Sequence, residues 1–110
     1  MKISRTEADL EAAFRNACTK YGGLARKLVS PGNSGVFDRF VVWDNGVTTY
    51  AELKRPDGTG KRSQLQLDEQ VLLESKGHLA MFIESEAHIA LFIKRSLDRV
   101  RAATLPGSRP

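Results

Sequence analysis

The sequence contains a single cysteine, Cys18, and only two histidines in 110 residues. One cysteine cannot form a disulfide within the chain, and it supplies too few thiolates for a cysteine-based zinc site. No histidine or cysteine stands at the spacing of a nucleophile and its base, which argues against a cysteine hydrolase. Cys18 falls on the apolar side of a helical pattern, so we expect it in the core.

Long hydrophobic runs are also absent. No apolar stretch approaches the roughly 20 residues that span a membrane, and the first residues, 1–5, lack the apolar core of a signal peptide. We therefore expect a soluble, intracellular protein that works in the cytoplasm. The sequence has no internal repeat, and we expect its Pro- and Gly-containing end, 105–110, to be a flexible tail.

The composition is that of an ordinary globular domain, with 41% hydrophobic and 27% charged residues. A chain of this length can bury one core, so we predict a single domain over residues 1–104. Seventeen Lys and Arg against thirteen Asp and Glu give a formal net charge of +4. This excess of positive charge indicates an anionic partner.

Hydrophobic periodicity predicts three helices. The first spans about residues 5–21, with Ser4 and Glu7 as a capping box and Gly22-Gly23 as its stop. The second opens at Ser63 and ends at Gly77, and the third runs from Ser85 to about Arg101. The expected apolar side of the second helix consists of Leu65, Leu67, Val71 and Leu72.

Runs rich in Val, Phe, Thr, Tyr and Trp predict strands over residues 24–29, 37–43 and 47–53, and a further strand is expected over 79–84. The second and third runs are almost continuously apolar, which is typical of central strands covered on both faces. The element order α-β-β-β-α-β-α predicts an α/β fold with a mixed four-stranded sheet flanked by helices.

The connection between the second and third strands, Asp44-Asn45-Gly46, carries turn chemistry. A three-residue loop built on a type I turn, with Gly46 in the left-handed conformation, would pair Trp43 with Val47. A two-residue loop at Asn45-Gly46 would shift this pairing by one residue.

The register of this hairpin decides whether two acids face each other. With the three-residue loop, Asp38 lies opposite Glu52, their side chains start about 5 Å apart, and Lys54 points to the same face as Glu52. Two facing carboxylates are costly unless a proton or a cation lies between them, so this arrangement indicates a divalent metal ion. With the two-residue loop, Asp38 would oppose Leu53, and Glu52 and Lys54 would be an ordinary solvated pair.

In this order and spacing, the sequence resembles the restriction-endonuclease-like PD-(D/E)xK nucleases. More narrowly, it is similar to the VRR-NUC family in its short stand-alone form from phages and bacteria. The matching residues are 27–32 (KLVSPG), 35–39 (GVFDR), 52–56 (ELKRP) and 63–66 (SQLQ), followed by Gly77. Phe37 stands where the family has a proline before its aspartate, which affects local stiffness and removes no ligand.

The resemblance implies metal-dependent hydrolysis of a DNA phosphodiester. Asp38, Glu52 and the backbone carbonyl of Leu53 would hold Mg²⁺ or Mn²⁺, since hard oxygen ligands suit these ions. Lys54 would orient the attacking water or stabilise the transition state.

Two more positions match the family and also fit a purely structural role. Gln66 corresponds to a glutamine near the active site, yet Ser63 and Gln66 also form a capping box, and one residue could serve both purposes. The family has a first-helix glutamate near its metal ions. Glu7 is a candidate for that metal ligand, although a helix cap is the favoured interpretation of Glu7, and Glu11 competes for the same role.

Five basic residues flank the predicted site and would contact DNA phosphates: Lys27, Arg39, Arg55, Lys61 and Arg62. The resemblance implies a structure-specific endonuclease for branched DNA, such as a four-way (Holliday) junction, in a bacterium or a phage-infected host. Paired nicks in a two-fold junction need two sites, so we expect a homodimer, with the last helix as a candidate interface. The alternatives are an inactive DNA-binding module of the same fold, or a nuclease acting on another nucleic acid such as RNA.

Overall fold

The computed structural model describes residues 6–29 and 35–103. The elements follow in the order α1 (Glu7–Lys20), β1 (Leu24–Lys27), β2 (Arg39–Val42), β3 (Thr48–Leu53), α2 (Gln64–Ser75), β4 (Ala80–Ile83) and α3 (Glu86–Ala103). The strands form one sheet in the order β1-β2-β3-β4, in which only the β3–β4 pair is parallel. The predicted fold class, element order and mixed sheet are confirmed. The tail 105–110 lies outside the described residues.

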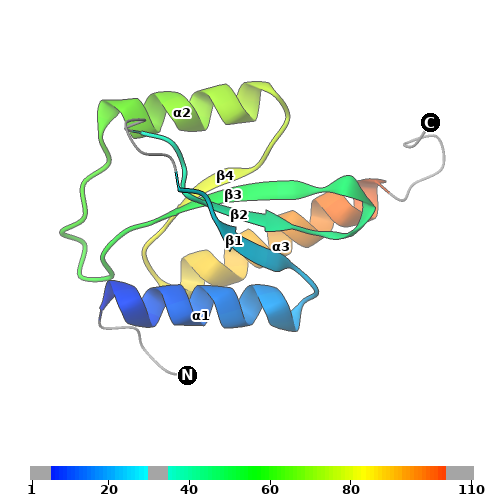
Figure 1. The fold of residues 1–110 in the computed structure, drawn as a ribbon, viewed down its shortest axis with the longest axis horizontal. Coiled ribbons are helices and arrows are strands. Elements are labelled where there is room, and N and C mark those ends of the chain that lie inside the picture. Colours follow the sequence, from blue (N-terminus) through cyan, green and yellow to red (C-terminus); the bar gives the residue numbers. More distant parts are fainter. Residues whose placement is uncertain (1–5, 30–34, 104–110) are drawn as a thin grey trace.

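Helices cover both faces of the sheet, with α1 and α3 on one face and α2 on the other (Figure 1). The larger core lies on the α1–α3 face, where side chains such as Leu10, Phe14 and Phe92 pack against Val41 and Ala51. A smaller cluster on the α2 face contains Phe37, Ala80 and Phe82, with Leu67 and Leu73 packed against it. As predicted, β2 and β3 are the central strands, but α2 covers its face only in part, and Val42 remains 37% exposed.

Of the two registers that the sequence allows for the hairpin of β2 and β3, the structure has the one expected from a three-residue loop. Arg39 pairs with Ala51, and Val42 with Thr48. The Trp43 N–H donates to the Val47 carbonyl at 2.8 Å, which closes a three-residue loop. One step beyond the first pair, this register sets Asp38 opposite Glu52.

The turn inside this loop differs from the predicted type I turn. Both Asn45 (φ 63°) and Gly46 (φ 74°) adopt left-handed conformations, and the Val47 N–H approaches the Asp44 carbonyl at 3.4 Å. Two successive positive φ angles are the mark of a type I′ turn, which matches the twist of a hairpin. The sequence Asn-Gly can form this turn because asparagine tolerates the left-handed region better than most residues do.

The loop is fastened to α3 by polar contacts. The Asn45 side-chain amide donates to the Val100 carbonyl at 3.2 Å. In the adjoining part of the hairpin, the Trp43 indole N–H donates to Thr49 Oγ1 at 2.9 Å. The buried hydroxyls of Thr49 and of Ser96 on α3 lie 3.0 Å apart. The hairpin is thus held at its turn as well as along its strands.

The start of α1 differs from the prediction. Thr6 is the N-cap, because its hydroxyl accepts a hydrogen bond from the Asp9 N–H at 3.0 Å, and the helix begins at Glu7. The predicted Ser4–Glu7 capping box is therefore wrong, and Ser4 itself lies outside the described residues. Cys18 is fully buried in the core as predicted, and burial raises the pKa of its thiol to about 12.

The capping box of α2 is confirmed, whereas its predicted apolar side is right for Leu67 and wrong for Leu65, Val71 and Leu72. The Ser63 hydroxyl accepts from the Gln66 N–H, and the Gln66 carboxamide oxygen accepts from the Ser63 N–H. Leu67, Gln70 and Leu73 turn toward the sheet, and the Gln70 amide donates to the Ala80 carbonyl. The remaining apolar side chains are more than half exposed: Leu65, Val71 and Leu72.

The helix α3 buries one stripe that contains Ile89, Phe92, Ile93 and Ser96, and leaves Leu91 36% exposed. Packing within the monomer therefore accounts for most of its apolar character. Within residues 6–29 and 35–103, no helix has the length and hydrophobicity that crossing a membrane requires.

Replacement of Asn45 tests what holds the loop. Asn45→Ala removes the hydrogen bond to Val100 and puts a less tolerant residue at φ 63°, so we expect a loss of about 1–2 kcal/mol in the free energy of unfolding. Asn45→Gly removes the same hydrogen bond but accepts the backbone conformation, and should lose less. Urea unfolding of the two variants measures the difference, and equal losses would contradict this account of the turn.

Candidate active site

Asp38 and Glu52 come together at the open end of the β2–β3 hairpin. The Asp38 carbonyl accepts a hydrogen bond from the Leu28 N–H at 2.7 Å, which ties the start of β2 to the end of β1. Ala51 and Leu53 point into the α1–α3 core, so Glu52 between them projects toward the α2 face. The fold therefore places the two predicted carboxylates at opposed positions of neighbouring strands.

The carboxyl group of Glu52 is in an unfavourable electrostatic position. Its Oε1 atom is buried and has no hydrogen-bond partner among the described residues. Burial raises the pKa of Glu52, and the negative charge of Asp38 raises it further, while Lys54, the Asp38 backbone N–H and Arg39 act in the opposite direction. A buried, unpartnered oxygen next to a second carboxylate is a place where a cation would be stabilised.

Lys54 is held in place by two oxygen atoms. Its ammonium group donates to the Gln66 carboxamide oxygen at 2.6 Å and to the Lys61 backbone carbonyl at 2.8 Å. The same Gln66 oxygen belongs to the capping box of α2. Gln66 thus serves both as a helix cap and as a contact of Lys54, as the sequence allowed.

Arg39 joins the first helix to the site. Its guanidinium lies 3.1 Å from a Glu11 carboxylate oxygen and 3.1 Å from an Asp38 carboxylate oxygen. The residue is only 9% exposed, and its Nη1 atom makes no hydrogen bond of good geometry in the described structure. A buried cation between two acids orients both of them, because any separation would leave a charge uncompensated.

The remaining predicted residues occupy the surface around these groups. Glu7 is exposed at the first turn of α1, and the described contacts connect Glu11, rather than Glu7, to Asp38. Lys27 lies opposite Arg39 in the β1–β2 register. Arg55 pairs with Asp57 at 3.4 Å, and the Arg62 guanidinium lies 4.3 Å from the centre of the Phe82 ring.

The Arg39 bridge is the part of the site that the sequence reasoning missed. The sequence predicts a DNA contact for Arg39, whereas its contact with Glu11 depends on the packing of α1 on the sheet. One signal was available, since Glu11 lies one position after Leu10 on α1 and therefore close to its buried side.

The oxygen atoms of Asp38 and Glu52 are the groups at this site that could hold a divalent ion. Among the described residues, no group of three His, Cys, Asp or Glu side chains gathers at metal-binding distances. The site instead offers two opposed carboxylates, one with a buried unpartnered oxygen. Such a set suits Mg²⁺ or Mn²⁺, which bind through one or two carboxylates and keep several waters. The residues fit the ion.

The pKa of Glu52 gives a test of this electrostatic description. In the metal-free protein, a raised pKa means that ionised Glu52 destabilises the native state, and this cost grows as the pH rises through the native pKa. Glu52→Gln mimics the protonated acid. In EDTA at pH 7 to 8, we expect the variant to have a higher melting temperature than the wild type. This difference in melting temperature should shrink toward pH 4.

Thermal unfolding followed by circular dichroism across this pH range measures the gap. Asp38→Asn is the matched control. It removes the neighbouring negative charge that raises the pKa of Glu52, so Glu52→Gln should raise the melting temperature less in this background. A Glu52→Gln protein that melts below the wild type by the same amount at every pH would contradict the burial of an unpaired carboxylate.

Comparisons with known proteins agree with this geometry. No family model matches the sequence. The chain is 38% identical over 78 residues to a protein named "Putative nuclease p44" from Acyrthosiphon pisum secondary endosymbiont phage 1, and the match spans 71% of this chain and 81% of that protein. A solved structure described as a VRR_NUC domain superposes with a TM-score of 0.72 at 26% identity, covering 83% of this chain and 97% of that one.

The sequence relative is identical at more than a third of the aligned positions, and most of its length is covered. The structural neighbour has the same helices and mixed sheet over almost its entire chain. The chain belongs to the VRR-NUC family of nucleases.

Proposed function

We propose that this nuclease is a Mg²⁺- or Mn²⁺-dependent endonuclease that cleaves DNA and acts on branched structures such as four-way junctions. The observation that carries the proposal is the pair of opposed carboxylates, Asp38 and Glu52, beside an ammonium group that Gln66 holds in place. Opposed acids with a fixed cation next to them are the groups that phosphodiester hydrolysis needs.

Each residue has a distinct part in the proposed reaction. Asp38, Glu52 and the Leu53 carbonyl would hold the ion, which supplies positive charge against the negative charge that grows on the scissile phosphate. The Lys54 ammonium would orient the attacking water or donate to the phosphate in the transition state. Its hydrogen bonds to Gln66 and Lys61 limit its motion, so that it needs little rearrangement during the reaction.

Basic side chains around the site would bind the DNA backbone. Lys27, Arg55, Lys61 and Arg62 are exposed, and each can form a salt-sensitive contact that is independent of the base sequence. Arg39 differs from these four because it is buried and paired with two carboxylates. We propose that the main role of Arg39 is to position the carboxylates of Asp38 and Glu11, and that only the exposed edge of its guanidinium could contact a phosphate.

A homodimer would supply the second site that symmetric cleavage of a junction requires. The last helix is a poor interface, since its apolar stripe is already buried in the monomer. The exposed apolar side chains of α2, Leu65, Val71 and Leu72, form a surface that a second copy would cover. We place this activity in the cytoplasm of a bacterium or of a phage-infected host.

A cleavage panel tests the proposal. Labelled single-stranded, duplex, flap and four-way DNA are incubated with the protein and either Mg²⁺, Mn²⁺ or EDTA, together with an RNA duplex. We expect nicks in the branched DNA with either metal ion and none in EDTA. Asp38→Asn should lower the rate by at least about 100-fold, while the exposed α3 variant Asp98→Asn, a matched Asp-to-Asn control, should cleave like the wild type.

Undiminished cleavage by Asp38→Asn, or full activity in EDTA, would contradict the assigned site. Preferential cleavage of RNA would contradict DNA as the substrate and would mean that the same site acts on RNA. Sedimentation of the protein used in the panel should show a dimer, and a monomer that still cuts both strands of a junction at symmetric positions would contradict the dimer proposal.

A further inference from the structure

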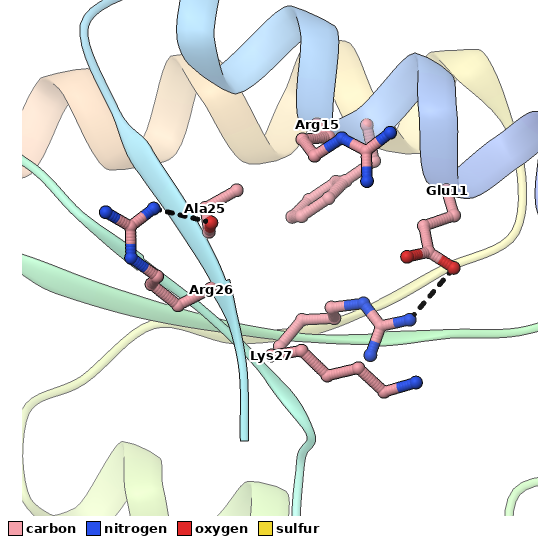
Figure 2. Close-up of a pocket in the computed structure, with 7 residues that line it drawn as sticks. Glu11, Arg15, Ala25, Arg26 and Lys27 are labelled. Atoms are coloured by element: carbon pink, nitrogen blue, oxygen red, sulfur yellow. Dashed lines mark hydrogen bonds and ion pairs between the residues drawn. The ribbon is translucent and has the colours of Figure 1, made fainter. Parts of the chain in front are cut away.

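A cavity of about 110 Å³ lies between α1 and β1, beside the candidate active site. We call it the α1–β1 groove. It is lined by Glu11, Phe14, Arg15, Ala25, Arg26, Lys27 and Arg39 (Figure 2). Four of these seven residues are cations, and one is an acid. A cavity with this charge attracts an anion.

Within residues 6–29 and 35–103, the positive charges of the groove are only partly neutralised. The single acid, Glu11, is engaged by Arg39. Arg26 donates to the adjacent Ala25 carbonyl at 3.1 Å, and Figure 2 shows it on the side of β1 away from Glu11. Arg15 and Lys27 make no hydrogen bond or ion pair with any other described residue, and both are exposed. Two unpaired cations therefore remain available to an anion from outside.

The picture and the register show how these two cations face the same space. Figure 2 shows Arg15 extending from α1 into the region above Lys27, with Glu11 to one side. Lys27 ends β1 and lies directly opposite Arg39. A single anionic group between α1 and β1 could contact Arg15 from the helix and Lys27 from the strand.

The groove and the candidate active site share one residue, Arg39. Arg39 forms its wall and also contacts Asp38 at 3.1 Å. From Glu11 to Arg15 the groove follows α1 for one turn, about 6 Å, so it leads away from the carboxylates. A nucleic-acid strand that places one phosphate at Asp38 and Glu52 would bring a neighbouring phosphate here.

The lining of the groove indicates which part of a nucleic acid it accepts. The aromatic residue Phe14 is only 1% exposed, so it offers no ring face on which a base could stack. Such a groove would bind the backbone and would not read the sequence.

We propose that the α1–β1 groove is a second phosphate-binding site, in which Arg15 and Lys27 hold a backbone phosphate next to the scissile one. Arg39, fixed by Glu11, forms the wall between this site and the metal-binding carboxylates. The inference rests on the proposed function and deepens it, because it gives the direction in which the substrate strand leaves the site. It also assigns Arg15, a helix residue outside the matching motifs, to DNA binding.

Binding measurements in EDTA test the groove without cleavage. The affinity of the full chain for labelled four-way DNA is measured over a KCl series for the wild type, Arg15→Gln, Arg15→Lys and Arg99→Gln. Each lost phosphate contact lowers the slope of log affinity against log salt by about 0.7–0.9. We expect Arg15→Gln to bind several-fold more weakly with a slope smaller by about 1, and Arg15→Lys to recover most of the slope.

Arg99→Gln is the matched control. It removes the same charge from another helix, beside Thr48 and His78 at the opposite end of the sheet, and should leave the slope unchanged. If the wild type binds and cleaves DNA but Arg15→Gln has the same affinity and salt slope as Arg99→Gln, the groove proposal is overturned and the proposed function is not. If the wild type neither binds nor cleaves any of the nucleic acids, the proposed function is overturned and the groove with it.

Discussion

The closure of the β2–β3 hairpin by a three-residue loop is the constraint on which the site depends. Because side chains alternate between the faces of a sheet, a shift of one residue would send Glu52 and Asp38 to opposite faces. The hydrogen bond from Trp43 to Val47 sets the register, and the contacts of Asn45, Thr49 and Ser96 fasten the hairpin to α3. A loop at one end of the sheet thus controls the chemistry at the other.

The electrostatics of the site follow from this placement. Three carboxylates, Glu11, Asp38 and Glu52, face two fixed cations, Arg39 and Lys54. Arg39 neutralises the acids on the α1 side, and Lys54 is turned toward Gln66 of α2. Glu52 therefore keeps a buried oxygen that has no hydrogen-bond partner in the described part of the chain. A cation between the acids would be stabilised there. In the proposed function, the positive groove outside this cluster would attract the DNA backbone, and the cluster would attract the metal ion.

Much of this could be predicted from the sequence, and the failures have local causes. Turn chemistry at residues 44–46 allowed two registers, and the three-residue loop that sets Asp38 opposite Glu52 is the one observed. The Ser63–Gln66 spacing correctly predicted the start of α2. The apolar side of α2 was misjudged because Leu65 and Leu72 follow a helical spacing as convincing as that of Leu67 and Leu73, and only the position of β4 selects between them. The cap of α1 moved to Thr6, where a second hydroxyl residue competed with Ser4. The Arg39 bridge could not be read from spacing, since it joins residues 28 positions apart through the packing of α1 on the sheet.

We propose that Asp38 and Glu52 hold a divalent ion between them. A crystal structure of the full chain grown with Mn²⁺, with diffraction recorded at the manganese absorption edge, tests it most directly. We expect an anomalous peak within about 2.2 Å of an oxygen of each carboxylate, and no such peak in crystals of Asp38→Asn. A wild-type crystal with no peak between these residues, at a Mn²⁺ concentration that supports cleavage in solution, would contradict it.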